Sequence, residues 1–119
     1  MSTLASVQGT WDVTTNGWSG QLNISSLDGQ GNLAGTLTIT TTDQGSPTGE
    51  TGTPVRGYWN GGAQEIWFRR DQSPQTYTGY GYSRLGRPDS VQTLAGFFED
   101  IGTADRHRFG WVASRPIPG

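Results

Sequence analysis

The residues of this chain that could carry out nucleophilic or acid–base chemistry are few. The single histidine, His107, stands between Arg106 and Arg108, and no Gly-x-Ser-x-Gly turn supplies a serine nucleophile. A histidine between two arginines at a strand entrance is typical of an ordinary surface position. Because the chain has no cysteine, thiol nucleophiles, thiolate metal sites and disulfides are excluded.

The acidic residues do not form a convincing site either. Glu99, Asp100 and Asp105 surround one loop and carry the oxygen ligands that a hard cation prefers, but three such acids are usually just solvated. Paired-carboxylate glycoside hydrolysis would need Glu65 to face a cavity. Strand alternation instead turns Glu65 outward beside Arg56, as half of a surface cross-strand pair. We therefore expect no catalytic residue, no metal and no cofactor.

Length, charge and hydropathy restrict the class of protein further. The chain has 119 residues, a net charge of −2 and no lysine, so one domain spanning residues 1–119 is expected, with no electrostatic attraction to nucleic acid. No stretch approaches the roughly 20 apolar residues of a membrane helix. The first nine residues have neither a basic start nor an apolar run. We expect a cytoplasmic protein, unless a leader has been removed.

The positions of turn residues predict an all-β fold. Nineteen glycines accompany many aromatic and few aliphatic residues, a composition that suits pleated sheets, and no window shows a helical repeat of apolar residues. Short connections make sequential strands antiparallel. The eight predicted strands are Gly9–Thr15, Trp18–Ser25, Asn32–Thr41, Thr53–Asn60, Gln64–Arg70, Gln75–Ser83, Val91–Glu99 and Arg106–Ser114.

Five of these strands share the pattern apolar-x-Gly-x-apolar, centred on Gly20, Gly35, Gly57, Gly79 and Gly96, although Gly81 replaces the last apolar residue of the fourth. Glycine within a strand is typical of a sharp bend or a close backbone approach. Its repetition favours a coiled sheet that closes on itself and so removes its edges. We predict an eight-stranded antiparallel up-and-down barrel, whose interior holds side chains or one small ligand.

The sequence Asn60-Gly61-Gly62 predicts the register of one hairpin. A two-residue loop at either Asn60-Gly61 or Gly61-Gly62 places Val55 and Trp59 on the same face as Ile66 and Phe68. The predicted inner face consists of Trp11, Val13, Leu22, Ile24, Leu33, Leu37, Ile39, Val55, Trp59, Ile66, Phe68, Tyr77, Leu94, Phe98, Phe109 and Trp111.

Three features of the sequence resemble the avidin and streptavidin family, within the wider lipocalin-like barrels. Gly9-Thr10-Trp11 opens the first strand as Gly-Thr-Trp does there, and Leu33-Ala34-Gly35-Thr36-Leu37 is similar to that family's third strand. The longest loop, Thr42 to Gly52, lies where the family has a lid over its ligand. The resemblance implies a barrel over nearly the whole chain, with a ligand site at one end.

The residues by which that family binds biotin are not found at the matching positions of this sequence. The family uses an Asn–Ser pair on the first strands, a Tyr–Ser pair on the third and a late Asp. Here the first strand reads Trp11-Asp12-Val13-Thr14-Thr15, and Leu37 occupies the position where tyrosine is needed. A buried polar ligand without hydrogen-bond partners loses much affinity, so biotin binding is not expected.

The odd-numbered turns and the long loop fall at one end of the barrel, which is the predicted mouth. An aromatic pocket with one arginine and one tyrosine hydroxyl fits a small, partly apolar molecule, with an anionic group as one option. The alternative is that the aromatic side chains simply fill the barrel. The predicted ligand-binding residues are Trp18, Ile39, Phe68, Arg70, Tyr77, Phe98, Phe109 and Trp111.

The later strands also carry aromatic residues on their outer face, namely Tyr58, Trp67, Tyr80, Tyr82 and Phe97. Contiguous apolar surface usually marks an interface. The resemblance implies pairing through these strands, so we expect a homodimer or homotetramer.

The leading hypothesis is therefore a non-catalytic small-molecule-binding barrel. One alternative is a carbohydrate-binding module, in which exposed Trp rings stack on sugars beside Asn, Gln and Asp. Another is a protein-binding inhibitor barrel that uses Met1–Val7 as a projecting arm. The last alternative is a purely structural role, in which self-assembly is itself the function.

Overall fold

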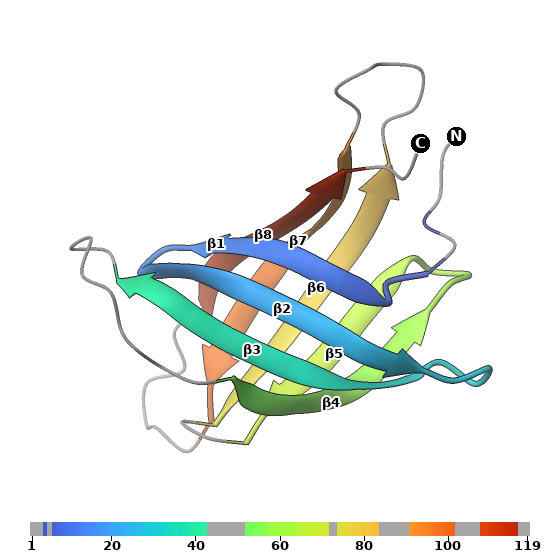
Figure 1. Ribbon diagram of the computed structural model, residues 1–119, viewed down its shortest axis with the longest axis horizontal. Coiled ribbons are helices and arrows are strands. Elements are labelled where there is room, and N and C mark those ends of the chain that lie inside the picture. Colours follow the sequence, from blue (N-terminus) through green and yellow to red (C-terminus); the bar gives the residue numbers. More distant parts are fainter. Residues whose placement is uncertain are drawn as a thin grey trace.

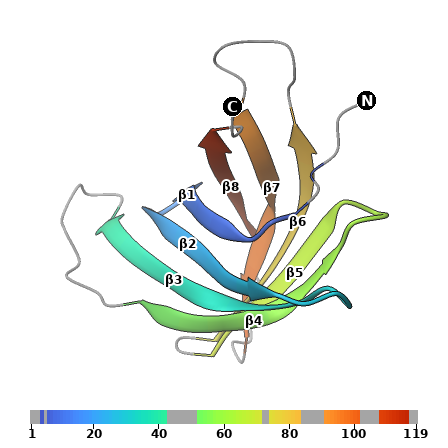
Figure 2. The same cartoon turned by 45° about the vertical axis from the view of Figure 1, so that its right-hand side comes forward.

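A computed structural model shows a closed barrel in which each strand pairs with its neighbours in sequence and β1 pairs with β8 (Figures 1 and 2). The structure describes residue 4 and residues 6–42, 52–71, 74–83, 91–101 and 108–116. The predicted antiparallel up-and-down barrel is confirmed. Its strands are β1 (Gly9–Thr15), β2 (Trp18–Leu27), β3 (Asn32–Thr42), β4 (Thr53–Asn60), β5 (Glu65–Arg70), β6 (Gln75–Ser83), β7 (Val91–Asp100) and β8 (Arg108–Pro116).

The largest differences from the predicted strand bounds have local causes. β2 continues two residues beyond Ser25 because the pairing register shifts between Ile24 and Ser26, and a β-bulge of this kind adds a residue without ending the strand. β8 reaches Pro116, which lies opposite Val91, and the ladder ends there because proline has no backbone N–H to donate. The predicted beginning of that strand, at residues 106–107, falls outside the described residues.

Four of the five repeated glycines lie where a neighbouring backbone comes too close for a side chain, whereas a Cβ atom at the fifth, Gly79, would first meet the Trp111 ring. A Cβ atom added to Gly57 would overlap the Trp67 carbonyl oxygen and lie 2.6 Å from Phe68 Cα, whereas real Cβ atoms stay beyond 3.0 Å. At Gly96 an added Cβ would likewise lie 2.6 Å from Gly79 Cα. Close backbone approach is a recognised reason for glycine within a strand, and here it accompanies the closure of the barrel.

The hairpin between β4 and β5 has a four-residue loop, so the predicted two-residue loop is wrong. Asn60 pairs with Glu65, and the Asn60 side-chain oxygen accepts hydrogen bonds from the backbone N–H groups of Gly62 (3.0 Å) and Ala63 (3.1 Å). The left-handed residue of the loop is Gln64, with φ of 54°. Because the loop is longer by an even number, the predicted sharing of one face by Trp59 and the β5 core residues still holds.

The predicted inner face fills the barrel, with Ile39 and Phe109 only half-buried. The core also contains two residues from the segment before β1, Leu4 and Val7, which are 2% and 0% exposed. The backbone N–H of Leu4 donates to Gln64 Oε1 at 2.6 Å, and Trp11 Nε1 donates to the Val7 carbonyl at 2.9 Å. These contacts contradict the projecting arm proposed for Met1–Val7 at the residues that the structure describes.

Arg115 of β8 holds the same segment from the other side. Its guanidinium lies 4.1 Å above the Trp11 ring and donates hydrogen bonds to the carbonyl oxygens of Ser6 (2.7 Å) and Gln8 (2.5 Å). Partial burial lowers the pKa of Arg115, but an arginine remains charged at any physiological pH. The start of the described chain is thus fastened to its last strand.

Candidate functional site

A pocket of about 200 Å³ lies at the predicted mouth. Three of the predicted ligand residues, Trp18, Phe98 and Phe109, line it. The remaining lining residues are Asn16, Gly17, Gln75 and Asp100. The loop predicted to act as a lid, together with Asp105 and His107, falls in residues 43–51 and 102–107, which lie outside the described part of the chain.

The aromatic rings that line the pocket and those beneath it contact one another in a continuous series. The Phe98 ring lies 6.3 Å from Trp18, 5.4 Å from Phe109 and 5.0 Å from Tyr77, measured between ring centroids. Tyr77 in turn stacks on Phe68 at 4.7 Å. These separations are those of favourable aromatic pairs, so the rings hold one another in place below the opening.

Three predicted ligand residues lie in the layer beneath the pocket and do not line it. Phe68 and Tyr77 are each 1% exposed, and Trp111 meets both rings edge-on at 5.8 and 5.9 Å. The indole N–H of Trp111 is directed at the backbone carbonyls of Thr78 and Phe97, each at 3.1 Å. The alternative that aromatic side chains fill the barrel therefore applies to this lower layer, while the rings at the rim leave a cavity.

A short polar chain runs from this lower layer to the rim. The Tyr77 hydroxyl donates to Gln75 Oε1 at 2.6 Å, and Gln75 Nε2 donates to Asp100 Oδ1 at 2.9 Å. Gln75 and Asp100 lie directly opposite each other on β6 and β7. A carboxylate accepts several hydrogen bonds, so Asp100 offers a ligand further acceptor positions. Sequence reasoning missed both residues, although each stands two positions from a predicted inward-facing ring.

The two other predicted ligand residues do not line the pocket. Arg70, at the end of β5, is only 6% exposed. Ile39 lies opposite Gly20 beside a register shift in the β2–β3 pairing, and such irregularities re-aim side chains. Among the described residues, the charged side chain that lines the pocket is therefore Asp100 and not Arg70, so the described wall of the pocket does not favour an anionic ligand.

Four of the five predicted outer aromatic residues, all except Tyr82, belong to two rows that cross the later strands. Ladder pairing aligns Tyr58, Trp67, Thr78 and Phe97 in one row. The Tyr58 and Trp67 rings stack at 5.7 Å, and Tyr58 is 45% exposed. The second row consists of Glu65, Tyr80, Ala95 and Val112.

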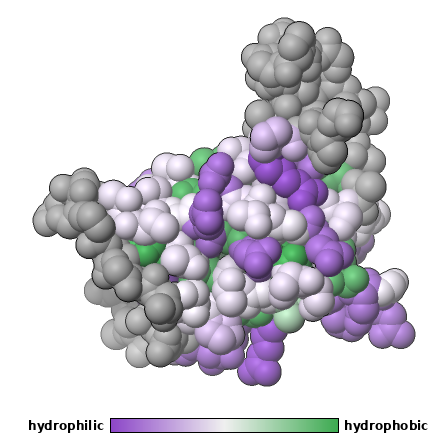
Figure 3. All heavy atoms as spheres, viewed as in Figure 1, coloured by the Kyte–Doolittle hydropathy of each residue, from purple (hydrophilic) through white to green (hydrophobic). Residues whose placement is uncertain are grey.

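Val112, which sequence reasoning missed, is 41% exposed, and Tyr80 is 54% exposed. The Tyr82 side chain lies outside the described residues. On the face seen in Figure 3, which β1, β2 and β3 dominate in the matching view of Figure 1, the coloured surface is mainly white and purple. Large exposed apolar side chains of the described residues thus gather on the later strands.

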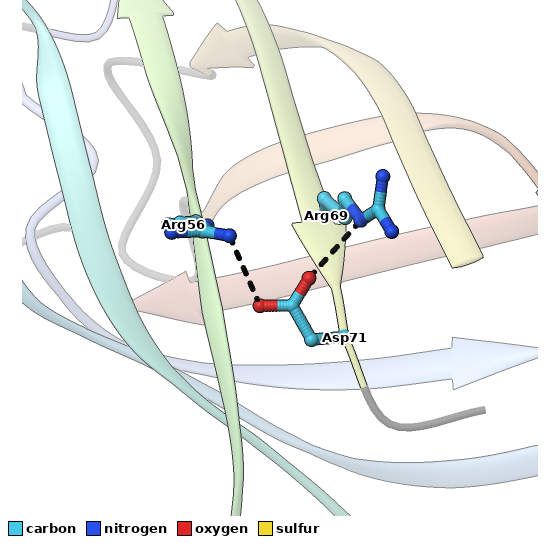
Figure 4. A network of polar contacts seen from close by, with 3 residues as sticks. All are labelled: Arg56, Arg69 and Asp71. Carbon is cyan, nitrogen blue, oxygen red and sulfur yellow. Dashed lines mark hydrogen bonds and ion pairs between the residues drawn. The ribbon is translucent and has the colours of Figure 1, made fainter. Parts of the chain in front are cut away.

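Charged residues border the apolar rows. The Asp71 carboxylate lies between Arg56, at 3.5 Å, and Arg69, at 3.0 Å (Figure 4). The predicted pairing of Arg56 with Glu65 is wrong, because Arg56 lies opposite Arg69 while Glu65 lies opposite Asn60 and Tyr80. Such exposed pairs contribute little stability.

On β7 and β8, Arg108 donates to Glu99 at 2.6 Å and covers the Phe97 ring at 4.5 Å. Among the described residues there is no cluster of three or more His, Asp or Glu side chains that could hold a metal ion. The same part of the chain contains no helix long and apolar enough to cross a membrane.

No protein-family model and no curated protein matches the sequence. Solved structures do match it. A low-affinity mutant of shwanavidin is 16% identical with a TM-score of 0.66, and the match covers 98% of this chain and 100% of that one. A complex of a shwanavidin variant with biotin gives 16% identity and a TM-score of 0.62, over 93% and 98% of the two chains. A rhizavidin–biotin complex gives 14% and 0.53, over 96% of each. The fold is therefore avidin-like.

Proposed function

We propose that this protein is a non-catalytic barrel that binds a small molecule in the mouth pocket. The observation that carries the proposal is the meeting of three aromatic side chains, Trp18, Phe98 and Phe109, with the Gln75–Asp100 pair at one opening. Pockets that combine apolar walls with a few placed polar groups are typical ligand sites. The biotin complexes of two structural neighbours support the same function for this barrel.

The lining of the pocket supports a particular class of ligand. A flat or apolar group packs against Phe98 between Trp18 and Phe109, and an N–H or O–H group of the ligand donates to Asp100. The volume of about 200 Å³ is below the usual range of roughly 300–1,000 Å³ for drug-sized ligands. The ligand is thus a small, uncharged or cationic molecule with an aromatic or alicyclic part and at least one hydrogen-bond donor.

The test is a screen of small heterocycles that carry N–H or O–H groups, read by ligand-observed NMR and by quenching of tryptophan fluorescence. Hits should lose binding with Trp18→Ala. They should weaken roughly tenfold or more with Asp100→Asn, since a hydrogen bond to a charged group is worth about 1.5–3 kcal/mol. Gln21→Ala, on the exposed outer face of β2, serves as the control. Hits that bind Trp18→Ala as well as the parent would refute the proposed site.

We also propose that the apolar rows on β4–β8 form the interface of a homo-oligomer. The stacked Tyr58 and Trp67 rings and the exposed Val112 support this, because monomers rarely leave such rows open to water. Light scattering should give a mass at a multiple of 12.8 kDa. Val112→Arg should reduce it to a single subunit, whereas Gln21→Arg on β2 should not. A monomeric parent protein at micromolar concentration contradicts the interface.

A further inference from the structure

A second and larger groove lies at the end of the barrel opposite the mouth. Its volume is about 720 Å³, and it is lined by residues 27–32 of the β2–β3 hairpin and residues 58–61 of the β4–β5 hairpin. Figures 1 and 2 show both hairpins projecting from this same end. The groove is separate from the mouth pocket, and the two share no lining residue.

The walls of the groove are held in place before any ligand arrives. The backbone N–H of Trp59 donates to the Gly31 carbonyl at 2.7 Å and so joins the two hairpins. Within the first hairpin, Asp28 Oδ1 accepts the backbone N–H groups of Gln30 and Asn32, each at 2.9 Å, and Oδ2 accepts the Asn32 side-chain amide at 3.0 Å. A site that is already ordered avoids part of the entropic cost of binding.

One polar group beside the groove makes no hydrogen bond with the residues that the structure describes. Trp59 is 7% exposed, and its buried indole N–H has no acceptor among those residues. A buried donor left in this state costs about 1–3 kcal/mol. A Cβ atom added to Gly61 would lie 3.6 Å from Trp59 Nε1, with no other heavy atom beyond the neighbouring residues within 4 Å. Gly61 itself lines the groove, so the buried N–H lies directly behind this turn residue at the wall of the groove.

The other groups in the groove are neutral amides and an aromatic ring. The Tyr58 ring is 45% exposed. The Asn60 side-chain oxygen caps the turn, while neither its NH₂ group nor the Gln30 side-chain amide makes a hydrogen bond with the residues that the structure describes. Amides both donate and accept hydrogen bonds, as sugar hydroxyls do. Asp28, the one charged side chain among the described lining residues, disfavours an anionic ligand.

We propose that this groove binds a neutral carbohydrate. A sugar oxygen accepts the Trp59 indole N–H beside Gly61, and the sugar hydroxyl groups exchange hydrogen bonds with the side-chain amides of Gln30 and Asn60. The inference concerns a site other than the mouth, so it stands independently of the small molecule proposed there.

The test uses an array of neutral gluco-, manno-, galacto- and N-acetylglucosamine oligomers, followed by calorimetry with those that bind the full chain. Gly61→Ala places a methyl group in the space beside the indole N–H, and its affinity should fall about tenfold or more. Gly62→Ala is the matched control, because it lies in the same turn, does not line the groove, and would meet only the Asn60 oxygen at 3.4 Å. Its affinity and melting temperature should equal those of the parent.

Gln30→Ala, an exposed turn variant, provides a second perturbation that should weaken binding without altering the fold. Trp18→Ala at the mouth should leave glycan affinity unchanged. The proposal is overturned if no neutral glycan binds the parent protein or if Gly61→Ala binds as tightly as the parent. It is equally overturned if Trp18→Ala abolishes glycan binding, since the sugar then occupies the mouth.

Discussion

Replacing Gly57 by alanine tests why glycine recurs in these strands. The new Cβ would overlap the Trp67 carbonyl oxygen and lie 2.6 Å from Phe68 Cα, inside the 3.0 Å that such atoms keep. The obstacle is backbone and not a flexible side chain, so β4 and β5 must move apart locally. Gly17→Ala is the comparison, because an added Cβ there meets no atom within 4 Å and Gly17 has no positive φ.

The expected loss follows from the hydrogen bonds of the ladder. Separating the strands at Gly57 stretches at least one pair of backbone bonds, each worth about 0.5–1.5 kcal/mol, and leaves buried groups poorly paired at about 1–3 kcal/mol. We expect Gly57→Ala to lower the free energy of unfolding by about 3 kcal/mol. Gly17→Ala should be neutral or gain up to about 1 kcal/mol, because alanine restricts the unfolded chain.

Urea unfolding followed by tryptophan fluorescence measures both variants. A loss of about 3 kcal/mol lowers the midpoint by roughly 2 M if the slope stays near 1.5 kcal/mol/M, within the usual range. If Gly57→Ala and Gly17→Ala unfold at the same midpoint with the same slope, the strands tolerate a side chain at their closest approach. Barrel closure would then not depend on these glycines.

Three further outcomes are expected. Arg115→Gln should lose the stacking on Trp11 and the bonds to the preceding segment, at a cost of about 1–2 kcal/mol, and hydrogen exchange at residues 6–8 should speed up; unchanged exchange would contradict the anchor. The hydrogen bond from the Asn32 side chain, followed by those from turn amides, lowers the pKa of Asp28. The stabilisation that the Asp28 carboxylate gives to the turn is therefore complete above the ordinary Asp pKa of about 3.9. It is lost as the pH falls through the lower pKa that Asp28 has in the folded protein. If the NMR signal of the Asn32 amide titrated with a midpoint at or above the ordinary Asp pKa, the hydrogen bond would be absent. Biotin should give no heat in calorimetry, because Leu37, 1% exposed, offers only hydrocarbon where tyrosine is needed; measurable binding would disprove that reading of the third strand.

The sequence allowed the barrel to be predicted because local patterns agreed with the overall topology. Period-two alternation identified the inward side chains of β4 and β5, and the Asn60-Gly61 turn indicated the same face even though the loop is longer than expected. Alternation failed at Ile39, where a register shift lies close by in the β2–β3 pairing. A bulge inserts a residue without a distinctive sequence pattern.

The parts that escaped prediction depend on contacts between distant segments. Leu4 and Val7 precede the first strand, so no period-two pattern marks them as core. Gln75 and Asp100 could have been predicted as pocket residues, because each lies two positions from an aromatic residue that was predicted to face inward. The groove beside Trp59 could not have been predicted from the sequence, since it forms only when two hairpins join through a backbone hydrogen bond.

The hydrogen bonds by which Arg115 of β8 holds the segment before β1 have a consequence for folding during synthesis. The hydrogen bonds from Arg115 to Ser6 and Gln8 span 109 and 107 residues of chain, and β8 is also the strand that completes the ring by pairing with β1. A nascent polypeptide still lacking residues 108–116 exposes unpaired edges on β1 and β7, which invite intermolecular pairing. The barrel therefore cannot close until β8 has emerged from the ribosome. Contacts between residues so far apart in sequence form slowly, over milliseconds to seconds.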